Sequence, residues 1–140
     1  MNVDVNYLGV LVAGIVAMVV GFVWYSALFG KTWQKLRGFT EESLKAAQKG
    51  VGTSYAVSFV LSLVTGYMMA HVMGLSENFF HYSAMQTGLT TAFFMWLGFV
   101  MPTQLTAMLF SDKKSTPLFL IDTGHQLASL IAMGIVLSFF

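Results

Sequence analysis

The chain has 140 residues, of which 56% are hydrophobic, 15% aromatic and only 9% charged. A soluble domain carries roughly 25% charged residues, so this composition excludes a water-soluble globular domain and predicts a surface that faces lipid. The net charge of +1 gives no bulk attraction to nucleic acid, and the absence of cysteine excludes disulfides, thiolate catalysis and cysteine-ligated metals.

The first apolar segment, residues 7–29, is long enough to cross roughly 30 Å of hydrocarbon as a helix. A cleaved signal peptide would have a positive start, a shorter apolar stretch and a small-residue cleavage site. Here the first basic residue, Lys31, follows the segment. We therefore expect the segment to remain in the membrane.

A loop is expected over residues 30–52, with a short amphipathic surface helix inside it. Thr40 is a good N-cap, and Glu41 and Glu42 would lie at the positive end of the helix. Lys49 precedes Gly50, which favours a helix end there.

Three more apolar segments follow, at residues 54–75, 84–110 and 117–140. Short loops separate them at residues 76–81 and 111–116, and Pro117 suits the first turn of a helix. The predicted fold is all-α: one transmembrane domain over residues 1–140 that forms a four-helix bundle.

All seven lysines and arginines lie in two of these loops, which predicts the orientation. They are Lys31, Lys35, Arg37, Lys45 and Lys49 in the first loop and Lys113 and Lys114 in the third. The positive-inside rule places both loops in the cytoplasm and both termini outside, N-out and C-out.

Small residues recur at every fourth position along the helices. Such rows allow the close backbone approach that holds helices together in lipid. We expect the first two helices to pack through Gly9, Ala13, Ala17 and Gly21 on one side and Ser54, Ser58, Ser62 and Gly66 on the other. Packing within one bundle and contact with a second subunit both remain open.

Asp122, His125 and Gln126 share one face of the fourth helix, because they are three and four positions apart. An ionisable residue inside a membrane helix is a functional candidate by default. The alternative is a structural polar pair in which Asp122 accepts a hydrogen bond from another helix, with Tyr25, Trp24 and Gln104 as the candidate donors.

Pro102 should kink the third helix beside Gln104, and the kink could help to line a cavity that opens to the cytoplasm. Trp24 and Tyr25 lie near the same depth. They also fit an interfacial aromatic belt, a role that suits Trp33 better than Trp24.

The outer end of the second helix carries Met68, Met69, His71 and Met73, but their spacing forms no tight metal motif. No phosphate-binding glycine loop, zinc-protease motif or nucleophile elbow is present. We therefore expect no cofactor, no metal and no enzymatic activity.

Three blocks of sequence resemble a known family. They run from Gly21 to Trp33, from Trp96 to Pro102 and from Leu118 to Asp122, and they are similar to recurrent blocks of a bacterial four-helix membrane family catalogued as domain of unknown function 1761. The resemblance implies the same topology and a bacterial inner membrane, and it implies no activity.

Three functions of different class fit these observations. The first is a small transport or channel-like protein that works as a homo-oligomer, because four short helices enclose little volume. The second is a non-catalytic accessory or scaffold subunit of a larger membrane complex. The third, an intramembrane enzyme, depends on Asp122 and His125 alone.

The predicted orientation can be tested with reporter fusions. Fusions after Lys49 and after Lys114 should report a cytoplasmic location, and fusions after Phe140 an external one. A C-terminus found inside the cell would contradict the four-span, N-out arrangement.

Overall fold

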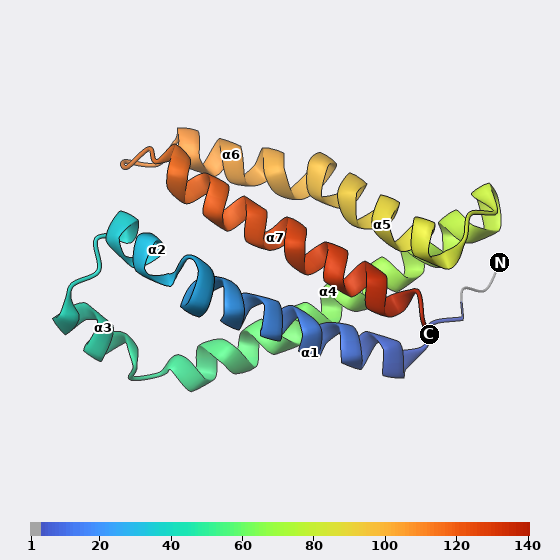
Figure 1. Ribbon diagram of the computed structural model, residues 1–140, viewed down its shortest axis with the longest axis horizontal. Helices are drawn as coiled ribbons and strands as arrows, with labels where there is room; N and C mark the ends of the chain where they lie inside the picture. Colours follow the sequence, from blue (N-terminus) through green and yellow to red (C-terminus); the bar gives the residue numbers. More distant parts are fainter. Residues whose placement is uncertain (1–3) are drawn as a thin grey trace.

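The computed structural model describes residues 4–140, which form an all-α bundle (Figure 1). Within these residues, four helices are long and apolar enough to cross a membrane: Tyr7–Leu28, Val51–Phe80, Ala84–Leu109 and Thr116–Leu137. Large apolar side chains on all four helices are exposed, so lipid is their expected surrounding. The chain is therefore a small multi-span membrane protein.

The first span consists of helix α1, Tyr7–Val23, and a π-helical turn, η1, Trp24–Leu28. Asn6 caps α1, because its side-chain oxygen accepts hydrogen bonds from the backbone N–H groups of Leu8 and Gly9. The Asn6 amide also donates to the carbonyl oxygen of Phe140 at 3.4 Å, which joins the two ends of the described chain.

Two short helices follow, α2 (Gly30–Arg37) and α3 (Glu41–Ala47), where the sequence predicted one. Thr40 caps α3 as expected, through a reciprocal pair of hydrogen bonds with Ser43. Helix α2 ends at Gly38 in the left-handed conformation that glycine adopts without strain. Helix α3 corresponds to the predicted helix, and its place on a membrane surface stays a prediction.

Helix α4, Val51–Phe80, is longer than the predicted segment 54–75 at both ends. The predicted loop at 76–81 is wrong, because the helix continues through most of it to Phe80. No glycine or proline interrupts the helix after Gly74. The helix ends at His81, which has a positive φ of 55°, and Ser83 caps the next helix through a capping box with Gln86.

The third span is built from α5 (Ala84–Met95), a π-helical turn η2 (Trp96–Val100) and α6 (Met101–Leu109). The π turn ends two residues before Pro102, whose ring nitrogen has no hydrogen to donate to the carbonyl of Gly98. The disturbance of the helix therefore takes the form of a wider turn on the N-terminal side of the proline.

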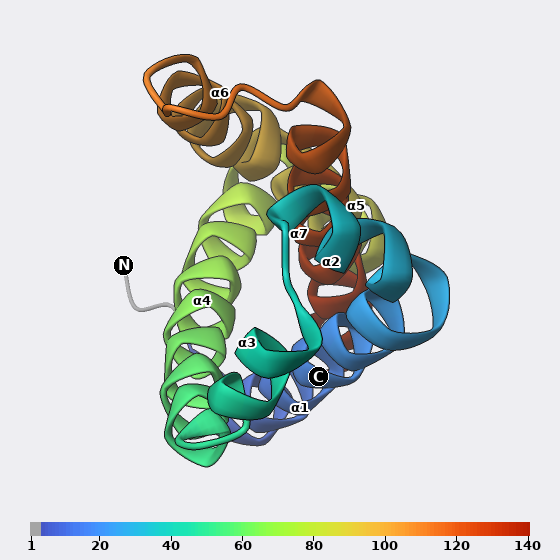
Figure 2. The ribbon, with the colours of Figure 1, turned by 90° about the vertical axis from the view of Figure 1, so that its left-hand side faces the viewer.

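Helix α7, Thr116–Leu137, lies between α1 and α5, while α4 packs on α1 and α5 (Figure 1, Figure 2). Each span contributes to one buried core of Ala13, Met69, Ala92, Leu130 and Met133. Met69 and Met133 are the largest of the fully buried side chains, so methionine fills the centre of the bundle as well as facing lipid.

The sequence suggested that the row of small residues on α1 faces α4. In the structure, two of the four do not. A Cβ atom on Gly9 would lie 2.8 Å from the Cβ atom of Phe140, and one on Gly21 would lie 3.2 Å from Nε2 of His125. Both glycines therefore face the C-terminal part of the chain. Ala13 is fully buried where α1, α4 and α7 meet, and Ala17 packs against that core.

Ala13 of the predicted row lies against Gly66 of α4, and Gly14, one position further along, also contacts α4. The Ser62 hydroxyl donates to the Gly14 carbonyl oxygen at 3.2 Å, and Gly66 is buried against α1. Ser54 and Ser58 are exposed, so the serine row expected to close this hairpin does so only in its second half.

The crossing of α5 and α7 has no room for a side chain. A Cβ atom on Gly134 would lie 2.5 Å from the Gly88 carbonyl oxygen, which belongs to the backbone and cannot rotate away. Gly134→Ala should lower the free energy of unfolding by about 1–3 kcal/mol, the usual cost of overpacking. Thermal unfolding in mild detergent measures the loss.

Gly52→Ala is the matched control, because nothing lies within 4 Å of a Cβ atom there. Alanine is a better helix former than glycine, so this variant should be as stable as the parent or more stable. Equal behaviour of the two variants would mean that the crossing is looser than described.

Candidate functional site

Asp122 is the centre of a hydrogen-bond network between the first span and α7. Its Oδ1 accepts from the Tyr25 hydroxyl at 2.9 Å and from the Trp33 indole nitrogen at 2.9 Å, and its Oδ2 accepts from Nη2 of Arg37 at 3.1 Å. The Arg37 contact is also an ion pair, and its two side chains are 46% and 24% exposed. The carboxylate therefore has both a neutralising cation and a donor for each oxygen.

These three donors come together because the chain bends between η1 and α2. Gly30 is buried at the bend, and a Cβ atom there would lie 2.6 Å from the Tyr25 carbonyl oxygen. Past the bend, Trp33 and Arg37 are four positions apart on one face of α2. The Arg37 guanidinium lies 5.2 Å from the centre of the Trp33 ring, which adds a cation–π contact.

Two further tryptophans bind the backbone of α7 on either side of Asp122. Trp24 donates to the Ile121 carbonyl oxygen at 3.1 Å, and Trp96 donates to the Thr123 carbonyl oxygen at 3.0 Å. Each tryptophan is the first residue of a π-helical turn. The first and third spans are thus attached to α7 at the residues directly before and directly after Asp122.

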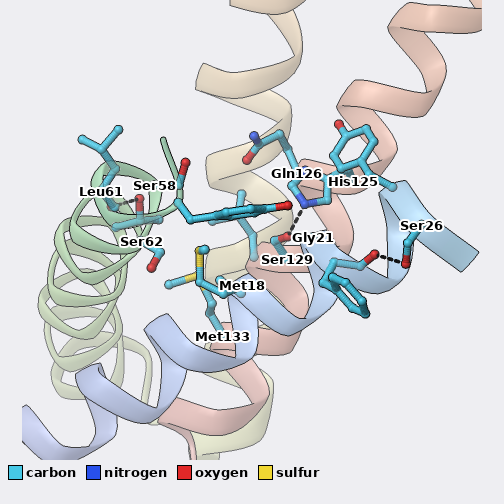
Figure 3. Close-up of a pocket in the computed structure, with 16 residues that line it drawn as sticks. Met18, Gly21, Ser26, Ser58, Leu61, Ser62, His125, Gln126, Ser129 and Met133 are labelled. Carbon is cyan, nitrogen blue, oxygen red and sulfur yellow. Dashed lines mark hydrogen bonds between the residues drawn. The ribbon is translucent and has the colours of Figure 1, made fainter. Parts of the chain in front are cut away.

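A groove with a volume of about 470 Å³ lies next to this network, between α1, α4 and α7 (Figure 3). Its polar lining residues are Tyr25, Ser26, Tyr55, Ser58, Ser62, Thr65, His125, Gln126 and Ser129. Its remaining lining is apolar or glycine and includes Met18, Leu61 and Met133. The groove exists because α4 leaves α1 beyond Ser62, where Ser58 and Ser54 become exposed.

His125 forms part of the groove wall and does not bind Asp122. Its Nε2 lies 3.3 Å from the Ser129 hydroxyl, and its ring centre lies 4.9 Å from that of Tyr25. Gly21 leaves space for the imidazole, since a Cβ atom there would lie 3.2 Å from Nε2. Gln126 lines the same groove. Asp122, His125 and Gln126 share one helix face but lie in two environments. Asp122 lies in the hydrogen-bond network, and His125 and Gln126 line the groove.

Of the donors predicted for Asp122, Tyr25 is the one that the structure places on the carboxylate. Trp24 binds the neighbouring backbone instead. Gln104 makes no hydrogen bond to Asp122, because it faces a second cavity, where its Oε1 is buried without a partner among residues 4–140. Of the three alternative donors, the structure therefore supports Tyr25 and neither Trp24 nor Gln104.

The sequence did not indicate three residues of this site: Trp33, Arg37 and Trp96. Trp33 was expected in an interfacial aromatic belt, yet its indole nitrogen donates to Asp122. The spacing of four between Trp33 and Arg37 was a usable signal, but only the bend at Gly30 turns that face toward α7. Nothing in the sequence linked Trp96 to Thr123.

The methionine and histidine residues at the other end of α4 form no site within the described residues. Met69 and Met73 are buried, and Nδ1 of His71 lies 3.0 Å from the Tyr67 carbonyl oxygen. Across residues 4–140, no group of three or more His, Asp or Glu side chains could hold a metal ion.

A family model described as "Protein of unknown function (DUF1761)" matches residues 8–138, nearly the whole chain. The match includes both π-helical turns, Asp122 and all three of its donors. No curated protein and no solved structure matches the chain.

Substitution of Asp122 tests whether the carboxylate holds α2 on α7. Asp122→Leu leaves the Tyr25, Trp33 and Arg37 donors without an acceptor. We therefore expect it to lower the free energy of unfolding by about 3–5 kcal/mol. Asp122→Asn keeps one acceptor oxygen but loses the ion pair, and a smaller loss of about 1–2 kcal/mol follows. Thermal unfolding in detergent is the measurement.

Asp112→Asn provides the control, because Asp112 is an exposed aspartate in the adjacent loop. It should change stability by less than about 0.5 kcal/mol, as surface substitutions do. If Asp122→Leu were as stable as the parent, the bend would be held by other contacts.

Proposed function

We propose that the chain, which belongs to the DUF1761 family, is a homo-oligomeric transport or channel-like protein of the bacterial inner membrane, with both termini outside. The observation that carries this proposal is the groove between α1, α4 and α7. It is large enough for a small solute, and it places hydroxyl, amide and imidazole groups inside a bundle of membrane-spanning length.

The groove gives a physical reason for a second copy of the chain. Polar side chains that face hydrocarbon cost free energy, whereas the same groups lining water or protein do not. Ser58 and Tyr55 are exposed on α4 beside the groove. A second protomer packed over this side would cover them and complete the wall of a pathway.

The chemistry of the groove suits an uncharged or weakly charged solute. Its lining residues include no lysine, arginine, aspartate or glutamate. A fully charged solute would therefore lose its hydration without gaining an ion pair. Hydroxyl groups and the Gln126 amide can replace water around a hydrogen-bonding solute, and the neighbouring methionines accept its apolar part.

The Asp122 network has a supporting role in this proposal. Its donors and the two tryptophans attach the first and third spans to α7, the helix that carries His125 in the groove wall. The carboxylate oxygens are already engaged by three donors. We propose no enzymatic role for the site.

A second candidate function is that of an accessory subunit of a larger membrane complex. It is favoured by the third span, Ala84–Leu109, of which 6% of the apolar window is buried, compared with 39% for Thr116–Leu137. In this role, another protein would cover the exposed surface of the third span in place of lipid. In that case the groove would lie against a foreign subunit.

The absence of cysteine allows single-cysteine labelling to test the groove. Ser58→Cys in reconstituted vesicles should react with a charged, membrane-impermeant thiol reagent, because the thiolate forms only in contact with water. Val60→Cys is the matched control, since Val60 is 57% exposed on the same helix and lies outside the groove. We expect at least a tenfold faster reaction at position 58.

The oligomeric state is measured on the same protein by light scattering in mild detergent. A dimer or larger homo-oligomer together with fast labelling at position 58 supports the transport proposal. A monomer in which both cysteines react equally slowly contradicts it and favours the accessory role.

A further inference from the structure

A second cavity, of about 420 Å³, lies between α2, α6 and the first turns of α7. It is separate from the groove of the proposed function, because the two share no lining residue. Its polar lining residues are Arg37, Gln104, Ser111, Lys113, Ser115 and Asp122. Its apolar lining residues are Leu36, Ala107, Met108, Leu118 and Phe119.

The charge of this cavity is positive. Arg37 and Lys113 contribute two positive charges and Asp122 one negative charge, so the lining carries a net charge of +1. The Asp122 carboxylate is engaged by Tyr25, Trp33 and Arg37, which leaves it little capacity to repel an anion. Lys113 forms no ion pair with any residue in the described part of the chain.

The amide of Gln104 is a second indication of a ligand. Its Oε1 is buried and has no hydrogen-bond partner among residues 4–140, and its side chain lines the cavity. A buried polar atom without a partner costs free energy, so a partner from outside the chain is expected. The two ends of an amide exchange by a flip of the side chain, so Gln104 can donate as well as accept.

The apolar side of the cavity distinguishes a lipid from a free anion. The apolar side chains of Met108, Leu118 and Phe119 make no favourable contact with inorganic phosphate, but they can pack against acyl chains. The cavity lies at the end of the spans where all seven lysines and arginines are found, the predicted cytoplasmic surface. Basic pockets between membrane helices on that side bind anionic lipid head groups.

We infer that this cavity binds the phosphate head group of an anionic phospholipid. Lys113 and Arg37 hold the phosphate, the Gln104 amide and the Ser111 and Ser115 hydroxyls hydrogen-bond to the head group, and the acyl chains follow α6 and Leu118 into the bilayer. The lipid would then lie against α2, α6 and α7 together.

The test compares phosphatidylglycerol with phosphatidylcholine of the same acyl chains, each added to the purified full-length chain in mild detergent. At about ten times the dissociation constant, phosphatidylglycerol should raise the melting temperature by about 3–6 °C more than phosphatidylcholine does. Native mass spectrometry should show the bound phosphatidylglycerol. Inorganic phosphate is added in a third arm.

Lys113→Gln removes the free cation and should abolish the difference between the two lipids without changing the melting temperature in detergent alone. Ala107→Trp, at an exposed position on α6, fills the apolar side and should have the same effect. Lys45→Gln is the matched control, because it removes an exposed charge at the same end of the molecule but outside the cavity.

A preference for phosphatidylglycerol that is lost in Lys113→Gln and kept in Lys45→Gln supports the inference. Equal stabilisation by both lipids overturns it, as does a preference that survives in Lys113→Gln. An equal shift from inorganic phosphate would show a free-anion site and also overturn it. None of these outcomes depends on transport activity.

Discussion

The Asp122 carboxylate imposes the strongest constraint on this bundle, because an ionised group among apolar helices must be surrounded by donors. The structure meets that need with Tyr25 from the π turn and with Trp33 and Arg37 from α2. Those donors reach one carboxylate because Gly30 permits a tight bend after the first span. The polar group that lipid would penalise is therefore also the group that fixes where α2 lies.

The two π-helical turns connect this network to the rest of the fold. Each begins with a tryptophan whose indole donates to a backbone carbonyl of α7, at Ile121 and Thr123. A π turn widens the helix by one residue, which alters the direction of the side chains that follow it. With α1 and α5 held on α7 in this way, α4 is the helix left free to diverge, and its divergence opens the groove lined by His125 and Gln126.

The groove between α1, α4 and α7 and the cavity between α2, α6 and α7 lie on either side of Asp122, and their chemistry differs. The lining of the groove has no lysine, arginine, aspartate or glutamate, whereas the lining of the cavity between α2, α6 and α7 carries a net positive charge. The crossing of α5 and α7 is close-packed instead, with backbone contact at Gly88 and Gly134.

The sequence by itself determined the four apolar spans, the family and Asp122 as the polar residue that needed partners, because hydropathy and motif spacing are local properties of the chain. Tertiary structure alone decided which partners Asp122 has. Trp33 and Arg37 belong to a charged loop in the sequence, and only the bend at Gly30 brings them to α7. The same holds for Gly9 and Gly21, whose spacing predicted close packing but whose neighbours, Phe140 and His125, depend on how helices far apart in sequence are rotated. Helix rotation is set by the sum of contacts across the bundle, and no single segment contains that information.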